Sequence, residues 1–100
     1  MPLVKVCTVD DVKEGQSKVV SANGNDIALF KQDGQFFAID NTCPHRGGPL
    51  GEGMVENGVV TCPWHGWRFD IATGVSPVMP SAKVGCYKVT VSGDDVMVEV

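Results

Sequence analysis

The chain has 100 residues, of which 43% are hydrophobic and 20% charged, and its formal net charge is −4. This length suits one domain with a modest core, and the balance of apolar and charged residues excludes wholesale disorder. The basic residues are scattered along the chain, which excludes a nucleic-acid interface, and no apolar run approaches the roughly 18 residues of a membrane span. We therefore expect one domain over residues 1–100 that binds neither nucleic acid nor membrane.

The start of the chain lacks the charged-then-apolar layout of a signal peptide, so a cytoplasmic location is expected. Structural disulfides are rare in that compartment, and the four cysteines therefore suggest a metal before a disulfide. A short helical turn is expected over Asp10–Gln16, because Asp10 can cap the N–H groups that follow and Gly15 can end the turn.

Most of the remaining signals are those of β-strands. Short stretches rich in β-branched or aromatic residues are separated by dipeptides that favour tight hairpin turns, such as Asn23-Gly24 and Asp33-Gly34. The strands expected on this pattern are Lys18–Ala22, Asp26–Gln32, Gln35–Asp40, Val59–Cys62, Tyr87–Ser92 and Val96–Val100. The two ends of the chain are thus predicted to form an antiparallel β-sandwich or barrel.

The middle of the chain, from about 41 to 80, has a different character. It holds five of the six prolines and is predicted to be loop-like, as a subdomain inserted at one tip of the β-structure. Within it, Cys43-Pro44-His45 is followed after sixteen residues by Cys62-Pro63-Trp64-His65. Each pair lies in a short loop that lets its two side chains point at one centre. Cys43, His45, Cys62 and His65 are therefore the candidate metal ligands, and we find no catalytic group beyond them.

The stretch CPHRGGPLGEG, together with CPWHGWRFDIATG, resembles the Rieske iron–sulfur proteins, and the size of the chain is similar to that of the small Rieske ferredoxins of ring-hydroxylating oxygenases. This resemblance implies one [2Fe–2S] cluster, with Cys43 and Cys62 on one iron and His45 and His65 on the other. It also implies an all-β, Rieske-like fold with the cluster at one tip. Pro77 and Pro80 match the proline loop that closes over the cluster in that family.

The same resemblance suggests a low reduction potential. High-potential Rieske proteins have a disulfide and two hydroxyl groups near the cluster, whereas this chain has Gly48, Trp64, Trp67 and Phe69 at those places. Fewer donors stabilise the reduced state less, so the midpoint is expected near the lower end of the Rieske range, roughly −150 mV. We expect Trp67 to shield the cluster, while Trp64 is equally suited to shielding and to partner docking.

Several alternatives remain open on sequence alone. Four such ligands also suit a structural zinc ion, although zinc sites more often pair Cys with Cys and His with His. Cys7 and Cys86 have no ligand partner at short spacing and are expected to be buried thiols.

The function that the resemblance implies is a one-electron carrier, and not an enzyme, that passes electrons from a flavin reductase to a terminal oxygenase. The alternative is the small Rieske-fold subunit of an assimilatory NAD(P)H nitrite reductase. A Rieske domain of an oxygenase catalytic subunit is disfavoured, because 100 residues leave no room for a mononuclear iron domain.

Overall fold

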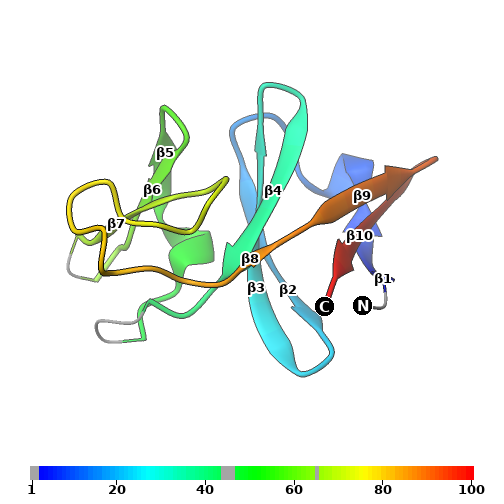
Figure 1. Cartoon of the computed structure of the whole chain (residues 1–100). Helices are drawn as coiled ribbons and strands as arrows, with labels where there is room; N and C mark the ends of the chain where they lie inside the picture. Colours follow the sequence, from blue (N-terminus) through cyan, green and yellow to red (C-terminus); the bar gives the residue numbers. More distant parts are fainter. Residues whose placement is uncertain (1–2, 44–46, 65) are drawn as a thin grey trace.

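The computed structural model describes residues 3–43, 47–64 and 66–100, which form an all-β structure (Figure 1). The strands are β1 (Leu3–Thr8), β2 (Ser17–Ala22), β3 (Asn25–Gln32), β4 (Gln35–Asp40), β5 (Met54–Glu56), β6 (Val59–Thr61), β7 (Arg68–Asp70), β8 (Cys86–Tyr87), β9 (Val89–Ser92) and β10 (Asp95–Glu99). Two 3-10 turns, η1 (Val9–Asp11) and η2 (Leu50–Glu52), complete the described elements. Neither turn has the length or apolarity that a membrane crossing requires, and the described residues hold no other helix.

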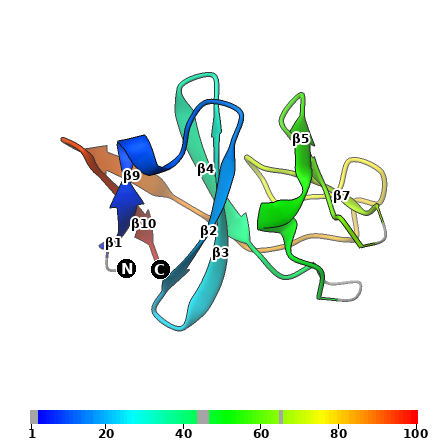
Figure 2. The ribbon, with the colours of Figure 1, turned by 180° about the vertical axis from the view of Figure 1, so that it is seen from behind.

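The described strands make three antiparallel sheets, with the orders β1-β10-β9, β2-β3-β4-β8 and β5-β6-β7. Viewed from the front or from behind, the β5-β6-β7 sheet lies at one end of the molecule and the β1-β10-β9 sheet at the other (Figures 1 and 2). The two termini run together at the latter end, where Leu3 pairs with Glu99. The two loops that hold the predicted ligands, called the ligand loops below, adjoin the β5-β6-β7 sheet, so the predicted site is at the end of the molecule away from the Leu3–Glu99 pair.

Tight turns of the expected kind join the hairpins. Asn23-Gly24, Asp33-Gly34 and Asn57-Gly58 each connect two paired strands, and all six residues have positive φ. A two-residue loop with both φ values positive matches the right-handed twist of the strands that it joins, and Asn, Asp and Gly tolerate that backbone. The prediction of hairpins at these dipeptides is confirmed.

The apolar residues form two buried clusters rather than one. The first lies between the β1-β10-β9 and β2-β3-β4-β8 sheets, which together form the base of the molecule. It includes Ile27, Leu29, Val96 and Val98, each fully buried. The second lies under the β5-β6-β7 sheet, and its buried members are Ala28, Phe30, Ile39, Cys43, Leu50, Val60, Cys62, Phe69 and Ile71. Strand β3 contributes to both clusters, because successive side chains of a strand point to opposite faces. The base is therefore packed directly against the half that carries the ligand loops.

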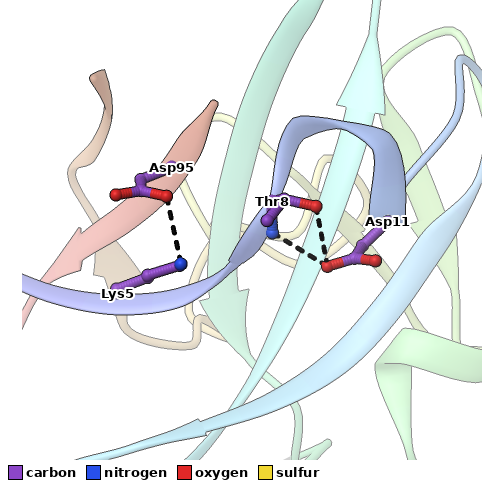
Figure 3. Close-up of polar contacts among 4 residues, drawn as sticks. All are labelled: Lys5, Thr8, Asp11 and Asp95. Carbon is purple, nitrogen blue, oxygen red and sulfur yellow. Dashed lines mark hydrogen bonds and ion pairs between the residues drawn. The ribbon is translucent and has the colours of Figure 1, made fainter. Parts of the chain in front are cut away.

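The helical turn predicted over Asp10–Gln16 is shorter than expected and begins earlier. It is the 3-10 turn η1, and its capping residue is Thr8 rather than Asp10 (Figure 3). The Asp11 carboxylate accepts hydrogen bonds from both the N–H and the hydroxyl of Thr8, at 2.8 and 3.1 Å. This closes the turn on itself, and Val12 is already extended and buried. In the same view Lys5 pairs with Asp95 at 3.1 Å, across β1 and β10.

Three strand predictions need correction. Strand β1 was not expected. In the loop-like middle the strand expected over Val59–Cys62 is confirmed as β6, but its partners β5 and β7 were not expected. The single strand expected over Tyr87–Ser92 is two strands in different sheets, with Lys88 between them. At Lys88 the chain leaves the β2-β3-β4-β8 sheet and enters the β1-β10-β9 sheet. The alternation of apolar and polar residues continues through this crossing, so the sequence pattern does not reveal it.

Candidate metal centre

The first ligand loop follows β4 and is closed by its own backbone. The N–H of Cys43 donates to the carbonyl of Gly48 at 2.9 Å, and the N–H of Gly47 donates to the carbonyl of Cys43 at 2.8 Å. Next to this pair, Thr42 and Pro49 form an isolated antiparallel bridge. The loop is therefore a narrow hairpin with Cys43 at one side of its base.

The second ligand loop, between β6 and β7, repeats the same pattern. The N–H of Cys62 donates to the carbonyl of Trp67 at 2.7 Å, and the N–H of Gly66 donates to the carbonyl of Cys62 at 3.0 Å. In both loops the glycine four positions after the cysteine has φ of +75°. Cys43 and Cys62 thus occupy equivalent positions in two matching loops.

Both cysteines are buried, each with 2% of its surface exposed, in the cluster beneath the β5-β6-β7 sheet. The sequence-predicted partners His45 and His65 lie outside the described residues, as do Pro44 and Arg46. The structure therefore brings Cys43 and Cys62 into one core, and within the described residues no three metal-ligating side chains gather. Ligation by the four residues stays a prediction.

Gly48 shows how closely the two loops approach each other. A Cβ atom built on Gly48 would lie 2.6 Å from Cys62 Sγ and 3.2 Å from Cγ of Trp64. Real Cβ atoms do not come so near to a sulfur, so only glycine allows this approach. The backbone of the first loop thus lies directly beside the sulfur of the second loop, so the two loops approach closely where both cysteines are buried. The donor set and this cradle fit a [2Fe–2S] group.

Residues that the sequence reasoning missed anchor the first loop to the base. Oδ1 of Asn41 accepts from the N–H of Gly51 at 2.7 Å, and the carbonyl of Asn41 accepts from the N–H of Leu50 at 2.7 Å. From β2, the hydroxyl of Ser17 donates to the carbonyl of Gly51 at 2.6 Å. The detectable signal was an Asn placed between a strand and a Cys ligand, since Asn commonly bonds to nearby backbone at strand ends.

Asp40 holds the returning chain against the end of β4. Its carboxylate accepts from the N–H of Gly85 at 2.7 Å and from the hydroxyl of Tyr87 at 2.5 Å. Partial burial, together with the hydrogen bond to this carboxylate and its charge, raises the pKa of Tyr87 to about 12. The contact joins the segment that follows the ligand loops to the strand that precedes them.

The proline loop lies beside the second ligand loop. The hydroxyl oxygen of the buried Ser76 accepts from the N–H groups of Val78 and Met79, at 3.3 and 3.1 Å. An apolar groove of about 340 Å³ separates the two loops, and its lining residues are Gly66, Trp67, Arg68, Ser76, Val78 and Met79. Val78 and Met79 of this lining are exposed, with 67% and 40% of their surfaces accessible, and Trp64 of the second ligand loop is 58% exposed.

The remaining aromatic and cysteine predictions fare differently. Trp67 is half-buried and packs against the cluster that contains Cys43 and Cys62, in line with a shielding role. Cys7 is buried as expected, whereas Cys86 is exposed, so the expectation for Cys86 is wrong. The thiol of Cys86 donates to the carbonyl of Ala72 at 3.1 Å, and β8 lies at an edge of its sheet, where burial is incomplete.

The chain belongs to the Rieske [2Fe-2S] domain family, whose model matches residues 2–96, and it binds one [2Fe–2S] cluster. It is 39% identical to the ferredoxin component of the p-cumate 2,3-dioxygenase system of Pseudomonas putida, with 98% of this chain and 86% of that protein covered. It is 33% identical to the ferredoxin component of the naphthalene 1,2-dioxygenase/salicylate 5-hydroxylase systems of a Ralstonia species, with 96% and 93% covered. At the level of sequence it is thus a Rieske ferredoxin of the kind found in dioxygenase systems.

Solved structures agree with this family. A ferredoxin from Sphingomonas yanoikuyae B1 has a TM-score of 0.89 at 31% identity, with 99% of each chain covered. Apoptosis-inducing factor 3 of Homo sapiens is 44% identical over 69 residues, but the chain spans only 11% of that longer protein. When bound, a [2Fe–2S] cluster accepts and releases one electron at a time. The expected fold class, all-β and Rieske-like, is confirmed, and so is the expected cofactor.

Proposed function

We propose that this chain is a one-electron carrier that receives electrons from a flavin-dependent reductase and delivers them to a terminal oxygenase. The observation that carries this proposal is the similarity to dioxygenase ferredoxin components over almost the whole of both chains. A further similar structure, with a TM-score of 0.86 and 31% identity, is described as a complex of reduced oxygenase and oxidized ferredoxin in carbazole 1,9a-dioxygenase. The chain is an electron-transfer protein and not itself the oxygenase.

The ligands in this proposal are Cys43, His45, Cys62 and His65, within a cluster-binding subdomain of about residues 41–80. Support comes from the matching backbone patterns of the two loops and the burial of both cysteines. We also propose that the protein works in the cytoplasm, together with the enzymes whose electrons it carries.

A small subunit of an assimilatory nitrite reductase is the less favoured alternative. A structure described as a putative nitrite reductase small subunit has a TM-score of 0.87 but only 23% identity to this chain. That similarity is evidence of a shared fold alone. The two dioxygenase ferredoxin components named above are 33% and 39% identical over a comparable length, which favours the oxygenase system.

The ligand set is tested by replacing proposed ligands and, as a control, a cysteine outside the ligand loops. Cys62→Ser and His65→Ala are expected to remove the Rieske optical and EPR signals and to lower the iron content from two atoms per chain, the complement of one [2Fe–2S] cluster, because an open iron site hydrolyses. Cys86→Ser is the matched control and is expected to keep both the spectrum and the iron, since its thiol lies outside the ligand loops. A variant at Cys62 or His65 with full iron and an unchanged spectrum would contradict the assignment.

The carrier role is tested by reconstitution. A dioxygenase reductase is expected to reduce the protein with NADH, and the reduced protein is expected to lose its electron to an oxidised terminal oxygenase in single-turnover stopped-flow mixing. The alternative predicts transfer to a nitrite reductase large subunit instead. Protein-film voltammetry on the same sample measures the midpoint, and a value above zero would refute the expected low potential.

A further inference from the structure

The two ligand loops meet at Gly48, where both Cys62 Sγ and the ring of Trp64 lie against the first loop. Each loop closes through its own backbone hydrogen bonds, Cys43 to Gly48 in the first and Cys62 to Trp67 in the second. These bonds fix the shape of each loop but not the spacing between the loops. The side chain of Trp64 makes a contact between the loops, because its ring atoms Cγ and Cδ2 lie 3.2 and 3.3 Å from the Cβ position of Gly48.

The two adjacent glycines of the first loop serve different purposes. Gly47 has φ of +75°, and a Cβ there would meet only a methyl group of Thr42 at 3.8 Å. Gly47 is therefore needed for its backbone conformation. No positive φ is found at Gly48, where a Cβ would instead collide with Cys62 Sγ and the indole of Trp64. Gly48 is needed for the close approach of the second loop.

Trp64 is far more exposed than the cysteine of the same loop, although both lie against Gly48. Cys62 is 2% exposed, whereas Trp64, two positions later in the same loop, is 58% exposed. One part of the indole thus packs against Gly48 beside the sulfur while the rest faces water. Because Trp64 packs against the same glycine that approaches Cys62 Sγ, the inner part of its ring lies close to the buried sulfur.

We propose that Trp64 is a positioning residue for the cluster: by packing on Gly48 it holds the two ligand loops at a fixed spacing and keeps water and oxidants from Cys62 Sγ. This inference rests on the proposed ligation by Cys62. It predicts that loss of the ring loosens the cluster even though Trp64 ligates no iron. It also predicts that another flat ring serves nearly as well, because packing and not the indole N–H does the work.

The test compares Trp64→Ala, Trp64→Phe and the control Met54→Ala in the loaded protein. Met54 is 80% exposed on β5 of the same half, so its removal takes away an apolar surface side chain but no loop contact. In aerobic buffer, the optical bands of Trp64→Ala are expected to bleach roughly tenfold faster than those of the parent, the equivalent of about 1.4 kcal/mol on the barrier. Trp64→Phe and Met54→Ala are expected to stay within about twofold of the parent.

A second measurement separates positioning from general destabilisation. Trp64→Ala is expected to broaden and shift the EPR g-values of the reduced cluster, because the ligand spacing is less uniform, whereas Trp64→Phe retains the parent spectrum. If Trp64→Ala yields no loaded protein, the same comparison is made between Trp64→Leu and Trp64→Phe. Equal bleaching rates and g-values for parent and Ala variant, or a Phe variant as labile as the Ala or Leu variant, would overturn the proposal. A parent protein without a Rieske spectrum would instead overturn the proposed ligands.

Discussion

At the scale of single residues, glycines divide into those that need a particular backbone and those that need space. Gly24 and Gly74 have nearly the same φ, +81° and +79°. A Cβ on Gly24 would meet nothing within 4 Å, but a Cβ on Gly74 would lie 2.4 Å from the carbonyl oxygen of Val84. That oxygen belongs to the segment that returns from the proline loop, and the carbonyl of Gly74 accepts from the N–H of Val84 at 2.8 Å.

Substitution of these two glycines by alanine is therefore expected to differ in cost. Gly24→Ala adds only the strain of a left-handed alanine, about 1–2 kcal/mol of unfolding free energy. Gly74→Ala adds the collision with Val84 and is expected to cost about 2 kcal/mol more. Urea unfolding followed by circular dichroism measures both. Equal losses would show that the Gly74–Val84 contact relaxes freely.

Tyr87 offers a direct measurement, since it is the only tyrosine of the chain. Absorbance at alkaline pH is expected to report a pKa of about 12 rather than the usual value near 10. Because the folded-state pKa is raised, the stabilisation that this hydroxyl provides is complete below about pH 10 and is lost as the pH rises towards 12. Asp40→Asn is expected to move the titration back towards 10 by removing the adjacent negative charge. A tyrosine that titrates near 10 in the parent would contradict this prediction.

At the scale of elements, local turn chemistry was predictable and sheet membership was not. Asn23-Gly24, Asp33-Gly34 and Asn57-Gly58 specify their own backbone, so the hairpins that they join could be placed from sequence. The short strands β5 and β7 have only three residues each, too few for a periodic pattern. They exist because β6 pairs with both of them, which is a tertiary fact.

The site shows the same limit. The spacing of the motif indicated Cys43 and Cys62, and the structure buries both. Asn41 carried a local signal, as an Asn between a strand and a Cys, but Ser17 lies far from it in sequence and meets it only through Gly51, so no local pattern indicates Ser17. The expectation that Cys86 is buried was wrong. Its strand, β8, has two residues and pairs on one side only, so the thiol stays exposed, and sequence alone did not reveal this position at a sheet edge.

Glu14 stabilises a turn that lies about twenty residues later in the sequence. Its carboxylate accepts from the N–H groups of Asp33 and Gly34, at 2.6 and 2.8 Å, and so caps the turn between β3 and β4. These hydrogen bonds, that of Gly34 first, lower the pKa of Glu14. The stabilisation is therefore present above the ordinary glutamate pKa and is lost as the pH falls through the lowered value.

Amide resonances of the turn are expected to report this titration. The Gly34 N–H shift should follow Glu14 in the parent, with a midpoint below the ordinary glutamate value, and should lose this response in Glu14→Gln. Glu56→Gln, an exposed residue at the end of β5, is the control and is expected to leave the Gly34 shift unchanged. A Gly34 resonance that does not respond to acid would remove the role assigned to Glu14.

At the scale of the whole molecule, the two ends differ in what they expose. The ligand-loop end presents the exposed apolar side chains of Trp64, Val78 and Met79. The other end carries the paired strands β1 and β10 and the Lys5–Asp95 ion pair. Exposed apolar side chains are readily desolvated, and electron transfer requires close approach to the cluster. The ligand-loop end is therefore expected to dock on the redox partners, and the net charge of −4 favours a partner with a positive surface.

Charge reversals at the two ends of the molecule test which end docks on the redox partners. Arg68→Glu and Lys5→Glu change the net charge equally, and Lys5 loses only a surface ion pair of small worth. Stopped-flow transfer to the oxygenase is expected to change roughly tenfold for Arg68→Glu, with an altered dependence on salt, because this side chain lines the apolar groove at the ligand-loop end. Lys5→Glu and Glu99→Lys alter only long-range steering, which salt screens beyond about 8–10 Å, and are expected to stay within about twofold at physiological ionic strength. Rates governed by Glu99 or Lys5 and insensitive to Arg68 would place the docking surface at the terminal end and would require an electron path through the base of the molecule.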